Sequence, residues 1–131
     1  MDVFYNDLMG QIWALFRNRR GRSFQYVSPV TKILLMSGSR SGWSNGFVDY
    51  NNDGWKDLFS ANGPANGDVD NLSPGSQQHD TIFENRDGKD FLDVSREMGN
   101  DFLRVGFQRE SAFSLNQKPR ILVNSADNGN H

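Results

Sequence analysis

Short runs of aromatic and β-branched residues alternate along the chain with clusters of Gly, Asn and Asp. This pattern is typical of β-strands joined by tight turns. No long helical period competes with it, although the apolar positions between residues 8 and 17 resemble a helical spacing. The sequence therefore predicts an all-β protein. The predicted strands lie near residues 2–5, 12–17, 23–27, 45–49, 56–60, 81–85, 91–94, 109–114 and 120–124.

Two segments of the chain resemble each other at an offset of 67 positions, since 83 minus 16 is 67. Residues 16–24 read FRNRRGRSF, and residues 83–91 read FENRDGKDF. Val27-Ser28 matches Val94-Ser95 at the same offset. Each copy places a glycine-containing turn between two Phe-bearing runs, which is the signature of a β-hairpin. A repeat of this length with several strands is typical of a propeller blade.

The chain accordingly divides into two repeat units, residues 1–62 and 63–124, followed by a tail at 125–131. We expect antiparallel propeller blades, about two in number. Because two blades do not close a ring and leave sheet edges exposed, we expect either a fragment of a larger propeller or a chain that self-associates. The opening residues 2–7 resemble the end of a further acidic loop of the kind described next.

Residues 49–57, DYNNDGWKD, place oxygen-bearing side chains on alternate positions around a glycine turn. Calcium takes six to eight oxygen ligands, so a loop that binds it needs several such groups aimed inward together. Gly54 permits the bend that this requires. The candidate ligands are the side chains of Asp49, Asn51, Asp53 and Asp57 and the main-chain carbonyl of Trp55.

An EF-hand does not fit this loop, because its twelfth position is Ser60 where an EF-hand needs Glu, and because both flanks are predicted strands. The other alternative is a metal-free turn held by Asp and Asn side chains. Three carboxylates within nine residues repel one another unless a cation lies among them, which favours calcium. The matching loop of the second unit, residues 114–120, has no carboxylate and two cations, so we expect no calcium there.

Residues 40–44, 46–59, 61–63 and 83–95 together resemble the FG-GAP or VCBS type of repeat. The resemblance is closest to the branch found in cartilage acidic secreted protein and in bacterial proteins that carry ASPIC/UnbV domains. It implies a calcium-stabilised β-propeller that lies outside the cytoplasm, in an extracellular, periplasmic or cell-surface position, and serves in adhesion or ligand binding without catalysis. It also implies that Asp49, Asn51, Asp53 and Asp57 bind calcium through side chains and Trp55 through its carbonyl.

The composition of the chain excludes several functional and structural classes of protein. The chain has 131 residues, enough for one modest domain, and a formal net charge of −2, which provides no field that attracts nucleic acid. It has no Cys and only two His, which exclude a disulfide framework and a zinc site. The first seven residues do not resemble a secretory signal, and no apolar run is long enough to span a membrane.

No nucleophile elbow, zinc-protease motif or phosphate-binding glycine loop occurs, so we expect no enzyme activity. A propeller hydrolase whose carboxylates lie partly outside this chain is an alternative. A second alternative is a carbohydrate- or protein-recognition module that acts through the polar loop at 62–80, because long loops on rigid scaffolds often bind ligands. This loop is equally compatible with a tolerated insertion.

Overall fold

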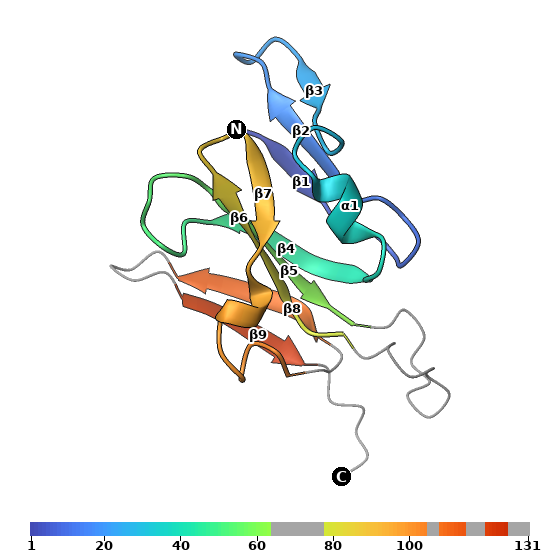
Figure 1. Cartoon of the computed structure of the whole chain (residues 1–131), viewed down its shortest axis with the longest axis vertical. Helices are drawn as coiled ribbons and strands as arrows, with labels where there is room; N and C mark the ends of the chain where they lie inside the picture. Colours follow the sequence, from blue (N-terminus) through green and yellow to red (C-terminus); the bar gives the residue numbers. More distant parts are fainter. Residues whose placement is uncertain (64–77, 105–107, 115–119, 126–131) are drawn as a thin grey trace.

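The computed structural model describes residues 1–63, 78–104, 108–114 and 120–125, and these form three antiparallel sheets (Figure 1). The predicted all-β class is confirmed. The first sheet has the order β1-β2-β3 and the second the order β4-β5-β6-β7, so neighbours in the chain are neighbours in each sheet. Their strands are β1 (Val3–Tyr5), β2 (Ala14–Asn18), β3 (Phe24–Tyr26), β4 (Gly42–Val48), β5 (Asp57–Asn62), β6 (Thr81–Arg86) and β7 (Asp90–Asp93).

The third sheet is the pair β8 (Gln108–Ser114) and β9 (Arg120–Ser125). Strand β8 lies beside β4 and β5, so the described part of the chain continues past the four-stranded sheet with a further antiparallel pair. All nine predicted strands overlap strands of the structure. Strand β4 begins three residues before its predicted start at residue 45, because it pairs with β5 as far as Gly42.

Two short helices were not predicted from the sequence. They are α1 (Ile33–Ser37) and the 3₁₀ helix η2 (Ser95–Glu97), and each is too short to show a periodic hydrophobic pattern. Helix α1 is positioned by its packing: Ile33 is fully buried, and the Ser37 hydroxyl accepts a hydrogen bond of 3.1 Å from the main-chain N–H of Trp13. Neither helix in the described ranges is suited to crossing a membrane.

The main hydrophobic core lies between the three-stranded and the four-stranded sheet. Trp13 is completely buried at its centre, with ring centroids 6.2 Å from Phe4 and 5.9 Å from Phe83. Because Phe4 belongs to the first sheet and Phe83 to the second, the indole of Trp13 joins the two sheets. The other buried members are Leu15, Val27, Ile33, Leu58 and Phe91.

A second core covers the opposite face of the four-stranded sheet. Every residue of β5 is buried, because alternate side chains of this central strand point into different cores. Leu58 belongs to the first core and Phe59 to the second. A continuous buried strand of this kind is expected only where both faces of a sheet are covered.

The β2–β3 and β6–β7 hairpins have the same turn geometry at positions 67 apart. In the first turn, the N–H of Gly21 donates to Oδ1 of Asn18 at 2.7 Å; in the second, the N–H of Gly88 donates to Oδ1 of Asn85 at 2.9 Å. Two successive residues in each turn have positive φ, which glycine adopts without strain. These residues are Arg20 (55°), Gly21 (72°), Asp87 (57°) and Gly88 (73°).

A hydrogen bond to a serine hydroxyl also recurs in the two segments at the offset of 67. The hydroxyl of Ser28 accepts the N–H of Leu15 at 2.8 Å, and the hydroxyl of Ser95 accepts the N–H of Ile82 at 3.1 Å. The two segments therefore share turns, strand pairing and serine contacts as well as sequence identities.

Asp80 is a buried carboxylic acid next to the start of β6. Its Oδ1 accepts the N–H of Asn62 at 3.1 Å, and its side chain is 5% exposed. Removal from water raises the pKa of Asp80 to about 7, and the hydrogen bond from Asn62 opposes only part of that effect. The folded protein therefore holds a proton on Asp80 over a pH range in which the unfolded chain does not.

We predict that Asp80→Asn stabilises the protein above pH 7. The folded pKa of Asp80 is about 7, and that of an unfolded Asp is about 4, so Asp80 makes stability fall as pH rises between these values. Asn keeps the oxygen acceptor for Asn62 and has no charge. At pH 8 the variant should gain about 2–4 kcal/mol in the free energy of unfolding, since each pKa unit corresponds to about 1.36 kcal/mol.

Urea unfolding of variant and parent at pH 4, 6 and 8 measures this difference. Asp57 also titrates in this range, but it is present in both proteins and cancels in the comparison. A stability difference that is the same at all three pH values would contradict the assignment to Asp80.

Candidate metal centre

The candidate calcium loop connects β4 to β5. Strand β4 ends at Val48, strand β5 begins at Asp57, and these two residues pair across the hairpin. The prediction of a strand on each side of the loop is confirmed, and the helix–loop–helix arrangement of an EF-hand is excluded. All the candidate ligands therefore lie between or at the ends of two paired strands.

The carboxylate of Asp49 lies at the base of the loop and accepts two main-chain hydrogen bonds. The N–H of Asp53 donates to its Oδ1 at 3.1 Å, and the N–H of Gly54 donates to its Oδ2 at 2.9 Å. The loop turns inward to make these contacts at two positive φ angles, 57° at Asn52 and 89° at Gly54. The glycine adopts this conformation at no steric cost.

Asn51 and Asp53 face each other across the turn. The side-chain amide of Asn51 donates to Oδ2 of Asp53 at 3.1 Å, and Oδ1 of Asp53 accepts the N–H of Trp55 at 2.8 Å. Both side chains are exposed. These are the local contacts that hold Asx-type turns, so the loop has a folded form that uses no metal.

Asp57 is the buried end of the loop, and its side chain is 0% exposed. Its two oxygens accept main-chain N–H groups, from Tyr50 at 3.1 Å and from Asn85 at 2.8 Å. Burial raises the pKa of Asp57 to about 6; these two hydrogen bonds lower it, and the nearby charges of Asp53 and Asp49 raise it again. The three carboxylates are thus close enough to repel one another.

Asp49, Asn51, Asp53 and Asp57 all lie at one end of the β4–β5 hairpin. Within the described residues, however, no group of three or more His, Cys, Asp or Glu side chains is already drawn together as a metal site. The donor set is made of hard oxygen atoms, which suits calcium better than a softer metal. Binding would require the carboxylates to approach one another more closely than they do in the present hydrogen-bonded turn.

Sequence reasoning missed the part that Asn85 plays beneath the loop. Its N–H donates to Asp57, its side-chain amide donates to the carbonyl of Lys56 at 3.0 Å, and its Oδ1 accepts the N–H of Gly88. One side chain therefore connects the loop to the β6–β7 turn. The available signal was the identity between Asn18 and Asn85 in the two similar segments.

The contact between Asn85 and Asp57 has a counterpart in the first sheet. There the N–H of Asn18 donates to Oδ1 of Asp2 at 2.8 Å, the same length as the bond from Asn85 to Asp57. The predicted likeness between residues 2–7 and the end of the acidic loop thus has a hydrogen-bonding counterpart at Asp2. Asp2 is half-buried, whereas Asp57 is fully buried.

The indole of Trp55 lies over the backbone of Gly88 and is 41% exposed. A Cβ atom on Gly88 would approach Cζ3 of this ring to 2.6 Å, so a side chain at this position would require the ring to move. The predicted role of Trp55 as a carbonyl ligand concerns its main chain. Its side chain has a separate role, which is to pack the loop against the β6–β7 turn.

No known protein family matches this chain, and no curated protein matches it closely enough to count as a relative.

We predict that Gly88→Ala destabilises the protein more than Gly21→Ala does. Both glycines have similar positive φ, 73° and 72°, so each substitution should cost about 1–2 kcal/mol in backbone strain. Gly21 has no atom within 4 Å of its added Cβ, whereas Gly88 has the Trp55 ring. The additional loss in the free energy of unfolding for Gly88→Ala measures the contact between the Trp55 ring and the β6–β7 turn.

Equilibrium urea unfolding of the two variants and the parent gives this comparison. Trp55→Ala provides a further check, because in that background the two glycine substitutions should cost the same. Equal losses at Gly21 and Gly88 in the parent background would show that the ring moves aside freely.

Proposed function

We propose that this chain is a non-catalytic, calcium-binding repeat module of a β-propeller of the FG-GAP or VCBS type. The observation that carries the proposal is the position of the buried carboxylate of Asp57 near Asp49 and Asp53. Burial is the main cause of the raised pKa of Asp57, and the charges of these two neighbours raise it further. A divalent cation among these groups would remove their repulsion and hold Asp57 ionised.

The arrangement of the strands supports the propeller part of the proposal. The sheet β4-β5-β6-β7 is an up-and-down antiparallel sheet of four strands, which is the size of a propeller blade. Strands β2 and β3 share their turn and serine contacts with β6 and β7 at the offset of 67. Strand β8 then lies beside β4, as the next blade of a radial array would.

The proposed role of calcium is to stabilise the blade. Its binding would draw the exposed side chains of Asn51 and Asp53 toward the buried end of the loop at Asp57. Because Asn85 is hydrogen-bonded to both Asp57 and Gly88, an ordered loop would also stabilise β6 and the β6–β7 turn. Because the ligands are scattered in the unfolded chain, the free energy of binding adds to the free energy of folding.

The wider role of the module follows from the same family resemblance. We propose a location outside the cytoplasm, in the extracellular space, the periplasm or at the cell surface, and a part in adhesion or in binding a protein or glycan. The polar loop at 62–80 is a candidate contact surface, but most of it, residues 64–77, lies outside the described residues.

We predict that Asp53→Ala abolishes most of the stabilisation by calcium. In the parent, calcium at about 100 times its dissociation constant should add about 2.7 kcal/mol to the free energy of unfolding and raise the melting temperature. The quantity to compare is the rise between excess chelator and calcium, because Asp53→Ala also removes the bond to Trp55 and lowers stability in both media.

Asp101→Ala is the matched control, since Asp101 is an exposed carboxylate in a turn outside residues 49–57. It should keep the full response to calcium. Equal calcium-dependent rises in the parent, in Asp53→Ala and in the control would mean that the loop is a metal-free turn, and the proposed function would be wrong.

A further inference from the structure

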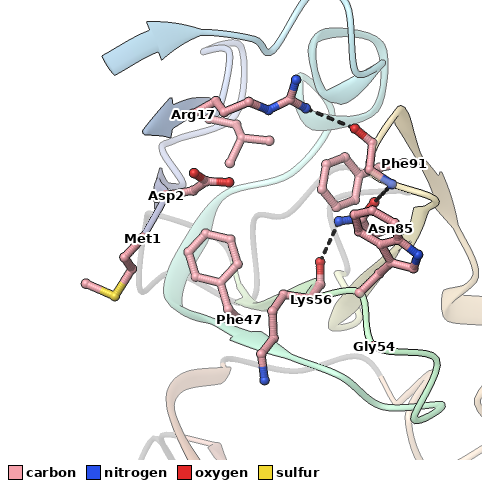
Figure 2. Close-up of a pocket in the computed structure, with 11 residues that line it drawn as sticks. Met1, Asp2, Arg17, Phe47, Gly54, Lys56, Asn85 and Phe91 are labelled. Carbon is pink, nitrogen blue, oxygen red and sulfur yellow. Dashed lines mark hydrogen bonds between the residues drawn. The ribbon is translucent and has the colours of Figure 1, made fainter. Parts of the chain in front are cut away.

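A cavity of about 480 Å³ opens between the first sheet, the β4–β5 loop and the β6–β7 turn (Figure 2). Strand β2 contributes Leu15 and Arg17, strand β4 contributes Phe47, and strand β7 contributes Phe91. Its volume falls within the range of about 300–1,000 Å³ that is usual for small-molecule sites. The cavity therefore has the size to hold an organic ligand, and its walls come from both larger sheets.

The floor of the cavity is apolar and rigid. Leu15 is 3% exposed and Phe91 is 6% exposed, and both belong to the main core, so neither side chain is free to fill the space. Phe47 is half-buried, packs on that core, and lies 6.5 Å from the ring of Phe4 in an edge-to-face contact. A flat apolar body would remove water from these surfaces on binding.

The lining of the cavity includes two cations, Arg17 and Lys56, and one carboxylate, Asp2, and the ammonium group of Lys56 points away from Arg17 in Figure 2. In the described part of the chain, neither cation forms a salt bridge. The guanidinium of Arg17 is held in place by a hydrogen bond of 3.1 Å from Nη2 to the carbonyl of Gly88. Arg has five N–H donors, so several of its donors stay available to a ligand.

We propose that this cavity binds a small organic anion with a flat, apolar body, such as an aromatic carboxylate. The body would lie on the apolar floor, and the carboxylate would lie against the guanidinium of Arg17. Arginine is well suited to this task, because its planar donors match the two oxygens of a carboxylate. Asp2 would oppose binding, although one of its oxygens already accepts the N–H of Asn18.

This ligand site is distinct from the proposed calcium site, although the two share a wall. The cation Arg17 belongs to β2, and the apolar floor comes from strands outside the acidic loop. The inference therefore does not rest on calcium binding. Titrations made in one buffer of fixed calcium content test it whether or not the loop takes up the ion.

The test uses 2-naphthoate as the probe and 2-naphthamide, which has the same shape and no charge, as its neutral control. Isothermal titration should show that the full chain binds the anion about fivefold or more tightly than the amide. Arg17→Gln should reduce this preference about fivefold, and circular dichroism checks that the variant, which loses the hydrogen bond to Gly88, still folds.

Asp2→Asn supplies a test in the opposite direction. The asparagine keeps an oxygen that can accept the N–H of Asn18 and has no charge, so 2-naphthoate should bind more tightly while the amide is unaffected. Arg22→Gln is the control, since it removes an exposed cation from the β2–β3 turn outside the cavity wall. Equal affinity for acid and amide, no binding of either at millimolar concentration, or the same effect from Arg17→Gln and Arg22→Gln would overturn the proposal.

Discussion

The rest of the structure around the acidic loop depends on one buried carboxylate, that of Asp57. A buried carboxylate is costly unless its oxygens have partners, and here each oxygen accepts a main-chain N–H. One donor, Tyr50, fixes the entry of the loop, and the other, Asn85, fixes the neighbouring strand β6. The position of the loop on the sheet is therefore set by satisfying a single side chain, and the other acidic residues are placed relative to it.

A similar hydrogen bond in the first sheet shows which properties belong to a single carboxylate and which arise from the other acidic residues of the loop. Asp2 accepts the N–H of Asn18 as Asp57 accepts that of Asn85, so the bond between strands is a property of this pair of residue types. At Asp57 burial is the main cause of the raised pKa, and the charges of two nearby carboxylates, Asp53 and Asp49, raise it further. The added charges are unfavourable for the metal-free fold, which is the physical basis for expecting a cation there.

The acidic loop is also the meeting point of several parts of the molecule. Trp55 packs on the β6–β7 turn at Gly88, whose carbonyl in turn accepts a hydrogen bond from Arg17 in the first sheet. A chain of contacts thus runs from the loop through the turn to the other sheet, and it encloses the cavity between them (Figure 2). Any change in the conformation of the loop would also change the cavity wall, because Trp55 and Lys56 belong to the loop and to the wall.

The sequence by itself determined the strands, the two hairpin turns and the loop that carries the candidate ligands. These depend on short-range properties: alternation of side chains, Asn and Gly at turns, and acidic residues at close spacing. The two short helices were not predicted, because helices of five and three residues are too short to show a periodic hydrophobic pattern. Only the tertiary structure decided the distant partners of Asp57 and Asp80, which are Asn85 and Asn62, 28 and 18 positions away along the chain. The cavity was also decided by the tertiary structure alone, because its walls come from separate sheets that meet only when distant segments pack together. The burial and the raised pKa values of Asp57 and Asp80 have the same origin.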